Sequence, residues 1–424
     1  MKLIIAEKPS VAKSIASALG ASSKADGFYE GSGLLVSWCV GHLVSPLDAG
    51  GYDERFKKWR YDDLPILPEP FRYVSIPGKE AALDNVKHLM AREDVTEIVN
   101  ACDAGREGEL IFRLVYEMAG CRKPVERLWI SSMEDSAIRE GFSELRPGAD
   151  YEALYQSALC RQRADWLVGI NATRLFSVLY HRTLNVGRVQ TPTLAMLAAR
   201  DAKIALFQKE KYHHVRLTLD GTEAVSERFT DPTEAERAAA MCKGATVTCT
   251  SVTCEQKKEP PPKLYDLTTL QREANRLLGY TAKQTLDYAQ SLYEKKLLTY
   301  PRTDSRYLTS DMAETASCVI HLAAKLPPFD GCTNFFPLVE VMISDRDVSD
   351  HHAIIPTMEI EKADIPALSL GERELLLLVC CRLLCASAEP YVYEAVTAAF
   401  GCGGHSFAAK GRRVLSEGWR EIDR

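Results

Sequence analysis

Two strand–turn–helix patterns constrain the fold of this chain more than any other feature of its sequence. Leu3–Ala6 is a short apolar run typical of a buried strand, and apolar residues recur at helical spacing through Val11–Leu19. The pattern returns at Glu97–Cys102, which we predict as a strand, and at Glu107–Ala119, which we predict as a helix. Strands that alternate with helices indicate an α/β unit with a parallel or mixed sheet.

The remainder of the chain divides into helical and β-rich stretches. Residues 151–206 have a helical pattern with one break at Asn185–Pro192, whereas Tyr212–Asp220 and Ala245–Cys254 alternate with β-branched residues, which predicts strands. Lys257–Lys263 contains three consecutive prolines and predicts a stiff linker at a domain boundary. Helices follow, with capping boxes predicted at Thr268/Gln271 and Thr281/Gln284. A short extended segment is expected at Leu297–Arg302, and Tyr391–Trp419 is again strand-like.

Composition limits the classes of protein that the chain can represent. Its 424 residues, 46% of them hydrophobic, suggest about two to four folded domains. A net charge of −6 argues against a protein that coats DNA, although a local basic channel can lie on an acidic body. Residues 151–200 fit such a channel, with six arginines against one Glu and one Asp. The 13 cysteines form no CxxC pair, so we expect no zinc site and a reducing cytoplasm. The N-terminus, MKLIIAEKPS, turns polar after a few apolar residues, so we expect no signal peptide or membrane span.

Carboxylates gather where the two predicted strands end. Glu7 follows the first strand, and Asp103, Glu107 and Glu109 follow the second. Converging carboxylates are the ligands that Mg²⁺ prefers, and the ion would orient a phosphodiester and neutralise its charge. The alternative is a solvated acidic helix N-terminus that the helix dipole favours.

A tyrosine and an arginine share one face of the segment TYPRTDS. The Tyr300 hydroxyl could attack phosphorus, and a phenol with a pKa of about 10 is also a fair leaving group, so the step is reversible. Arg302, two residues on, would hold the phosphate bidentately. The alternative is a structural tyrosine beside a surface arginine.

Two further motifs suggest contacts with a phosphate backbone. GRVQTP lies between predicted helices and could grip DNA with Arg188, Gln190 and Thr191, unless it is an ordinary helix–helix loop. In DHHAIIPT, one histidine could bind a phosphate or assist proton transfer. A pair of loop histidines is the alternative, and we favour it for His352.

Taken together, these motifs resemble the type IA DNA topoisomerases, most closely the bacterial topoisomerase III branch. The resemblance spans nearly the whole chain in order. It rests on AEKPSVAKSIA (Ala6–Ala16), GHLVSP (Gly41–Pro46), DAGREGELIF (Asp103–Phe112), RADWLVGIN (Arg163–Asn171), GRVQTPTL (Gly187–Leu194), TYPRTDS (Thr299–Ser305) and HHAIIPT (His351–Thr357).

The resemblance implies a multidomain α/β plus α+β fold in a toroidal arrangement. The expected parts are an N-terminal Rossmann-like Toprim domain (1–150), a helical gate domain (151–209), a β-rich hinge domain (210–262, returning at 390–424) and a helical tyrosine-bearing domain (263–389). It implies the following roles: Tyr300 as nucleophile, Arg302 as phosphate clamp, Glu7 and Asp103 as metal ligands, Lys8 facing the phosphate, Glu107 supporting metal or proton transfer, His351 as the functional histidine, and Gly187, Arg188, Val189, Gln190, Thr191 and Pro192 as a DNA-contact loop. Arg174 and Trp59 fall near positions at which relatives touch DNA.

Two departures from the family pattern qualify these expectations. The family's Asp-x-Asp-x-Glu motif has Gly105 at its middle position here, so we expect one functional Mg²⁺ rather than two. The chain also ends earlier than the family's members do, which suggests a truncated form with an incomplete ring.

The expected activity is cleavage of one DNA strand through a 5′-phosphotyrosine, strand passage and religation. This would relax negative supercoils or decatenate DNA without a nucleotide, since no Walker-type loop is present. The expected partners are Mg²⁺, single-stranded or underwound DNA and a helicase, for a monomer at the cytoplasmic nucleoid. One alternative is a Toprim nuclease or primase, against which TYPRTDS and GRVQTP argue. The other is a truncated DNA-binding fragment without strand passage.

Overall fold

The computed structural model describes residues 1–330, 337–348 and 351–423, which form two compact units. The first unit comprises residues 1–201, 265–306 and 345–377, and the second comprises residues 202–264, 307–344 and 378–424. Asp350, the first residue of the motif DHHAIIPT, lies outside the described residues, as does Arg424. No helix in the described part of the chain is both long and apolar enough to span a membrane.

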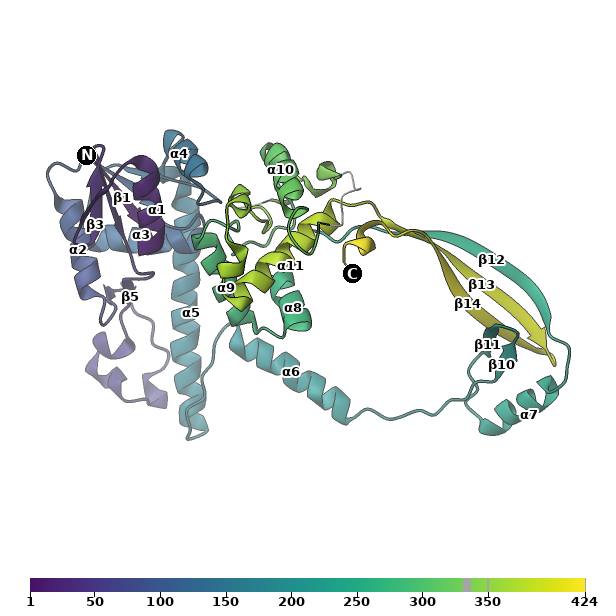
Figure 1. Ribbon diagram of the computed structural model, residues 1–424. Coiled ribbons are helices and arrows are strands. Elements are labelled where there is room, and N and C mark those ends of the chain that lie inside the picture. The colour runs from purple at the N-terminus through teal and green to yellow at the C-terminus, as the bar shows by residue number, and fades with distance from the viewer. Residues whose placement is uncertain (331–336, 349–350, 424) are drawn as a thin grey trace. The chain divides into compact units, whose positions relative to one another are not determined.

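A seven-stranded mixed sheet forms the centre of the N-terminal part, in the order β2-β3-β4-β1-β7-β8-β9 (Figure 1). β1 pairs in parallel with both β4 and β7. The strands are β1 (Lys2–Ala6), β2 (Ser23–Ala25), β3 (Phe28–Gly31), β4 (Leu34–Trp38), β7 (Glu97–Ala101), β8 (Val125–Arg127) and β9 (Arg146–Pro147). A separate pair, β5 (Val44–Pro46) and β6 (Tyr73–Ser75), is antiparallel. The predicted strands at Leu3–Ala6 and Glu97–Cys102 are therefore confirmed.

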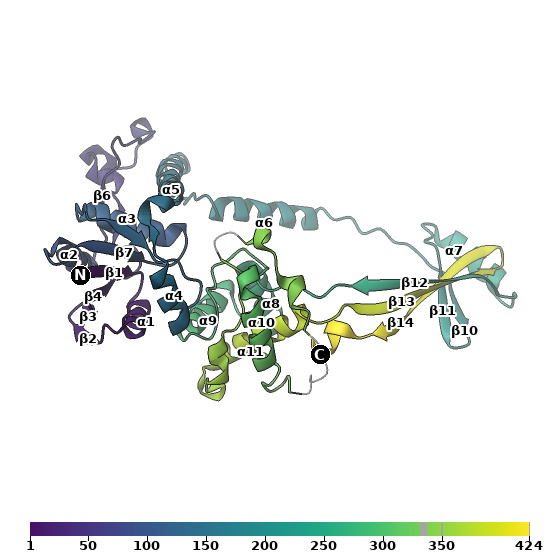
Figure 2. The same cartoon turned by 90° about the horizontal axis from the view of Figure 1, so that it is seen from above.

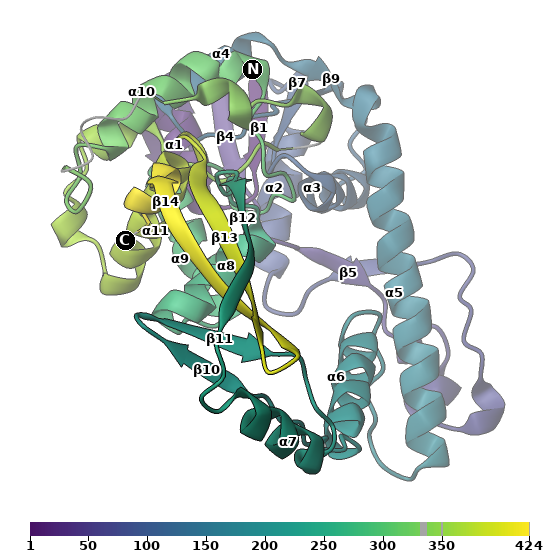
Figure 3. The same ribbon diagram turned by 90° about the vertical axis from the view of Figure 1, so that its right-hand side faces the viewer.

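Both faces of this sheet are covered, because alternate residues of β1 point to opposite sides. Leu3 and Ile5 join a core with α2 (Glu80–Ala91), α3 (Arg106–Met118) and the first turns of α5 (Glu152–Leu179) (Figure 3). Ile4 and Ala6 join a second core with α1 (Pro9–Leu19) and α4 (Asp135–Ser143). Tyr293 and Tyr300 belong to this second core, so the tyrosine-bearing segment packs directly on the sheet's α1 side.

The helical break after α5 lies earlier than predicted. α5 ends at Leu179 and α6 spans Gln190–Ala205, so Pro192 stands in the first turn of a helix rather than in the break. This placement is physically sound, because backbone N–H groups in a first helical turn have no intrahelical partner and proline lacks this donor.

The tyrosine-bearing segment begins with two capped helices, α8 (Leu267–Leu278) and α9 (Ala282–Glu294). The Thr281/Gln284 capping box is confirmed, but the box predicted at Thr268 is wrong. Asp266 caps α8, and its carboxylate accepts from the Thr269 N–H at 2.6 Å. Aspartate is as good a cap as threonine, and it lies where the chain is still extended. The extended segment predicted at Leu297–Arg302 is only partly present, because the chain bends at Leu297 and Pro301 and only Leu298 forms a β-bridge, with Pro356. Thr299 N–H donates to Ile355 O at 3.0 Å.

The second unit contains a five-stranded antiparallel sheet in the order β10-β11-β14-β13-β12. The strands of this sheet are β10 (Arg216–Leu219), β11 (Thr222–Ser226), β12 (Thr248–Glu259), β13 (Tyr391–Cys402) and β14 (His405–Ser416). The helices α7 (Pro232–Cys242) and α10 (Ala313–Ala323) belong to the same unit. Helix α11 (Leu370–Ala386) begins in the first unit and ends in the second. β12, β13 and β14 run side by side (Figure 2). The predicted linker at Lys257–Lys263 therefore begins later, because Lys257–Glu259 pair with β13 and only the proline at 260 ends the ladder.

Candidate active site

The two strands with the same pattern place Glu7 and Asp103 at one edge of the sheet. β1 and β7 are parallel, and Ala6 is opposite Ala101, so the residues that follow each strand emerge together. The backbone N–H of Asp103 donates a hydrogen bond to the Glu7 carboxylate. The sequence-predicted pair of metal ligands is thus brought together by strand register alone.

The two carboxylates perturb one another. Burial, followed by the charge of Asp103, raises the pKa of Glu7 to about 7, and Lys8 and Arg302 oppose this shift. Burial also raises the pKa of Asp103, against the effects of Lys8 and of a hydrogen bond from the Tyr300 hydroxyl. Two oxygen ligands that repel one another in a partly dry site suit a hard divalent cation, whose charge removes the repulsion.

Glu107, expected to support the metal or proton transfer, lines the same cavity as Glu7 and Asp103 but contacts a histidine. Its carboxylate lies 2.7 Å from Nε2 of His42, and this contact is the main reason that its pKa is lowered. Among the described residues, no third His, Cys, Asp or Glu side chain completes a three-ligand cluster with Glu7 and Asp103. His42 was missed as a site residue, although it stands in the motif GHLVSP.

The two glycines of DAGREGE differ in the space around them. A Cβ at Gly105 would meet nothing within 4 Å, so the missing middle acid of the motif leaves open space. A Cβ at Gly108 would lie 2.1 Å from the backbone oxygen of Asp103. Helix α3 can therefore approach the turn that carries Asp103 this closely only because residue 108 is glycine.

We predict that Gly108→Ala displaces the Asp103 turn. We expect it to lower the free energy of unfolding by about 1–3 kcal/mol, as overpacking does, and to weaken binding of Mn²⁺, a spectroscopic substitute for Mg²⁺. Gly105→Ala is the matched control and should cost no more than about 1 kcal/mol at its helix-capping position. Thermal unfolding and Mn²⁺ titration of both variants measure this difference, and equal behaviour of the two would contradict it.

Tyr300 is held at the same edge of the sheet. Its backbone N–H donates to Ser131 O at 3.1 Å, and its ring packs on His351 with a centroid distance of 4.5 Å. Burial raises the pKa of Tyr300 well above its ordinary value, as do the charges of Asp103 and Glu7, whereas Arg302 lowers it. The Tyr300 hydroxyl is therefore neutral at physiological pH.

One cavity of about 850 Å³ unites these groups. Its lining includes Glu7, His42, Asp103, Glu107, Arg161, Tyr300, Arg302 and His351. Arg302 thus lines the same cavity as Tyr300, as predicted, although the chain bends at Pro301 between them. Arg161, from α5, also reaches this cavity and was not singled out in the sequence.

His351 reaches the site but is engaged on both ring nitrogens. Its Nε2 contacts the carbonyl oxygen of Ala104, and its Nδ1 lies 3.1 Å from the Ser131 hydroxyl. Burial lowers its pKa to about 4, so the ring is neutral at physiological pH. A neutral ring that donates from Nε2 and accepts at Nδ1 satisfies both contacts. This arrangement favours a bracing contact to the Asp103 turn over the proton transfer suggested by the sequence.

Lys8 is paired with a residue that the sequence did not indicate. Its Nζ lies 3.1 Å from Oε1 of Glu294 in α9, and the Ser10 hydroxyl donates to the other oxygen at 3.1 Å. Lys8 is therefore beside the site and its charge acts on Glu7, but in this state its direct partner is a carboxylate.

Comparison with known proteins agrees with this geometry. A family model described as DNA topoisomerase matches residues 149–424, which is more than half of the chain. A second model, described as a Toprim domain, matches residues 2–133. The chain belongs to the DNA topoisomerase family. The Toprim domain is a divalent-metal-binding domain, which accords with the Glu7–Asp103 pair.

Individual relatives confirm the resemblance to type IA topoisomerases. DNA topoisomerase 3 of Shouchella clausii (strain KSM-K16) is 42% identical over 437 residues, which are 99% of this chain and 59% of the relative. DNA topoisomerase 3 of Bacillus subtilis (strain 168) is 41% identical over 433 residues, with the same coverage. Full-length topoisomerase I from Thermotoga maritima has the same fold, with a TM-score of 0.74 at 24% identity, covering 100% of this chain and 67% of that one. The chain thus spans 59% of the length of the curated relatives.

Two groups of residues expected to contact DNA do not line the cavity that contains Tyr300. In the loop before α6, Nε of Arg188 lies 2.6 Å from Asp165 of α5, and the Gly187 N–H donates to the Thr191 hydroxyl at 3.0 Å. Arg174 is buried, donates to Phe56 O at 2.7 Å and lies 5.5 Å above the Trp59 ring. Arg174 and Trp59 line their own cavity of about 360 Å³.

Proposed function

We propose that the chain is the catalytic body of a type IA topoisomerase that cleaves one DNA strand through Tyr300. The observation that carries this proposal is the cavity that Tyr300 lines together with Asp103, Arg302 and Glu7. A nuclease that uses only carboxylates has no use for a buried tyrosine at this point. We also propose that the protein passes a second strand through the break and so relaxes or decatenates DNA.

The side chains account for a reversible transfer of phosphorus. The Tyr300 oxygen forms a bond to phosphorus and passes its proton to Asp103, while the bond from phosphorus to the 3′ oxygen breaks. The departing 3′ oxygen takes up a proton from solvent in the cavity, because a carboxylate that holds a cation, as we propose for Glu7, is ionised. Arg302 stabilises the charge that develops on the phosphate oxygens. Reversal of these steps reseals the strand.

We propose that Glu7 and Asp103 hold a single Mg²⁺. When bound, such an ion supplies charge neutralisation and orientation of the phosphodiester. The donor set fits because both residues offer carboxylate oxygens at one point, and waters complete the octahedron that Mg²⁺ requires. Gly105 offers no ligand for a second ion.

We propose that separate ranges of the chain form domains with separate roles. We assign residues 1–150 to a Toprim domain, 151–209 to a helical gate domain, 263–389 to a tyrosine-bearing domain, and 210–262 with 390–424 to a hinge domain. The five-stranded sheet supports the last assignment, because it joins strands from both of these ranges. We also propose that the protein acts as a monomer on single-stranded or underwound DNA at the nucleoid, with a helicase as partner.

A cleavage assay tests the proposal. Single-stranded oligonucleotides labelled at either end are incubated with the protein and then denatured. We expect the fragment downstream of the cut to remain attached to protein through its 5′ phosphate, and the other fragment to end in a free 3′ hydroxyl. Cleavage that leaves both fragments free of protein would indicate the nuclease alternative. Binding without any cleavage would indicate a DNA-binding fragment.

The Arg188–Asp165 pair gives a prediction about DNA binding. If Arg188 leaves Asp165 to contact a phosphate, Arg188→Gln should weaken binding of single strands and lower the salt slope by about 0.7. Asp165→Asn is the opposing variant and should strengthen binding at low salt, because it removes the carboxylate that competes for Arg188. Fluorescence anisotropy across salt concentrations measures both slopes. An unchanged slope in Arg188→Gln would remove this residue from the interface.

A further inference from the structure

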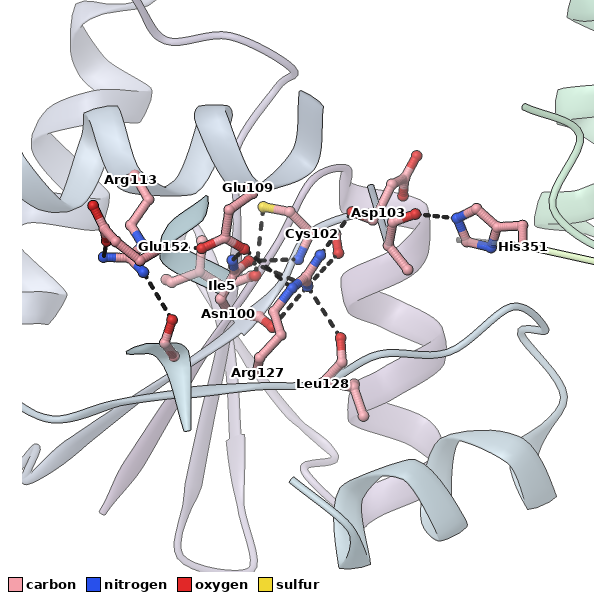
Figure 4. Close-up of polar contacts among 12 residues, drawn as sticks. Ile5, Asn100, Cys102, Asp103, Glu109, Arg113, Arg127, Leu128, Glu152 and His351 are labelled. Atoms are coloured by element: carbon pink, nitrogen blue, oxygen red, sulfur yellow. Dashed lines mark hydrogen bonds and ion pairs between the residues drawn. The ribbon is translucent and has the colours of Figure 1, made fainter. Parts of the chain in front are cut away.

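The turn that carries Asp103 rests on a buried arginine. Arg127, at the end of β8, has a fully buried side chain (Figure 4). Its Nη1 donates to the carbonyl oxygens of Cys102 and Leu128 at 2.6 and 3.0 Å, and its Nη2 donates to that of Asp103 at 2.8 Å. A fourth carbonyl, that of Asn100, accepts from Nη1 at 2.9 Å.

The ion pair with Glu109 neutralises Arg127, but it orients the guanidinium less than the hydrogen bonds to the carbonyls do. Nε of Arg127 lies 3.3 Å from Glu109 Oε2 but forms no hydrogen bond. Glu109 accepts hydrogen bonds instead from Arg113 Nε at 2.9 Å and from Asn100 Nδ2 at 2.8 Å. The donors of Arg127 are therefore directed mainly at the backbone of the turn.

A buried ion pair is a poor source of stability, because removing charges from water costs more than their attraction returns unless other hydrogen bonds compensate. An apolar residue would fill the same space without that cost. Only a planar group with several donors in a fixed fork can engage the carbonyls of Asn100, Cys102 and Asp103 together. The presence of arginine here thus indicates a geometric role.

The turn is held from two sides at consecutive residues. Arg127 binds the carbonyls of Cys102 and Asp103, and His351 contacts that of Ala104. The Trp129 ring lies between these two groups, 5.1 Å from the Arg127 guanidinium and stacked on His351 at 6.1 Å. A backbone fixed at both neighbours of Asp103 leaves its side chain few directions other than toward Glu7.

We infer that Arg127 is a positioning residue for the metal site: its contacts with the Cys102 and Asp103 carbonyls hold the Asp103 carboxylate beside Glu7. The inference rests on the proposed function for the identity of the metal ligands, and it extends that function to a residue with no access to the substrate. Outer residues that orient metal ligands typically change metal affinity by about 10–100-fold when they are substituted.

Metal binding without DNA tests the inference. Mn²⁺ binding is followed by electron paramagnetic resonance in the full chain, and thermal unfolding confirms that each variant is folded. Arg127→Lys keeps the charge but loses the planar fork, and we expect it to bind Mn²⁺ at least about 10-fold more weakly. If it does not fold, the paired variant Arg127→Met/Glu109→Met decides, because it leaves neither member of the pair buried alone and should show the same loss.

Arg113→Met is the matched control. Arg113 also pairs with Glu109, but its other contacts are with Gly148 O and Glu152, away from the turn. We expect its Mn²⁺ affinity to stay within about twofold of the wild type. An equal loss in Arg113→Met, or wild-type affinity in a folded Arg127 variant, would overturn the inference. The oligonucleotide cleavage assay on the wild type separates this result from failure of the proposed function, since Mn²⁺ binding requires neither DNA nor Tyr300.

Discussion

Tyr300→Phe should form no covalent complex with DNA and should still bind single strands with wild-type affinity. The substitution removes the oxygen that attacks phosphorus, and loss of a nucleophile typically costs on the order of 10⁴-fold or more in rate. The ring itself is buried against Tyr293 and His351, at centroid distances of 5.4 and 4.5 Å, and phenylalanine preserves that packing. Adduct formation on a denaturing gel and anisotropy with a labelled oligonucleotide measure the two properties.

Tyr293→Phe is the matched control for this prediction. Tyr293 lies in the same core and is buried, but it does not line the catalytic cavity. We expect near-normal adduct formation from Tyr293→Phe. Adducts from Tyr300→Phe at more than a few per cent of the wild-type rate would place the nucleophile elsewhere.

Glu7→Gln should make the metal-free protein more stable at pH 8 while it impairs cleavage. The folded protein raises the pKa of Glu7 to about 7, so it favours the protonated form. The stability from this group is fully present below its ordinary pKa of about 4.5 and is lost as pH rises through about 7. Because one pKa unit is worth about 1.4 kcal/mol, the loss at pH 8 is roughly 3 kcal/mol, which a neutral glutamine avoids. Urea unfolding without metal between pH 4.5 and 8 measures it.

Glu107→Gln provides the contrast to Glu7→Gln. The hydrogen bond from His42 lowers the pKa of Glu107, so its charge is favoured in the fold, and the substitution should give no stabilisation at pH 8. Saturating Mg²⁺ should reverse the order of wild type and Glu7→Gln, since only the wild type keeps both ligands. A Glu7→Gln protein that is less stable than the wild type at pH 8 without metal would contradict the raised pKa.

Local patterns predicted much of the fold because they are set by neighbouring residues. The apolar run at Leu3–Ala6 and the repeat of its pattern at Glu97–Cys102 sufficed to place Glu7 and Asp103 at one edge of a parallel sheet. Tyr300 and Arg302 line one cavity as predicted, although the chain bends at Pro301 between them and the spacing of a strand does not account for it. The cap of α8 was misplaced because both Asp266 and Thr268 are good capping residues.

Contacts between distant segments could not be predicted in the same way. Glu107 turns to His42, Lys8 pairs with Glu294 and His351 reaches the Ala104 carbonyl, and each contact depends on how separate segments pack. No feature of the sequence indicated a role for Arg127, because an arginine at the end of a short strand is usually exposed to solvent. These three contacts, together with those of Arg127, set the geometry that the predicted site residues adopt.

The position of the covalent bond tests the central claim most directly. Wild-type protein is trapped on a single-stranded oligonucleotide by denaturation, the complex is digested with protease and nuclease, and the modified peptide is sequenced by tandem mass spectrometry. We predict one nucleotide 5′ phosphate attached to the oxygen of Tyr300, in a peptide that contains the sequence TYPR. A phosphate on any other residue, or cut DNA without a modified peptide, would contradict the account.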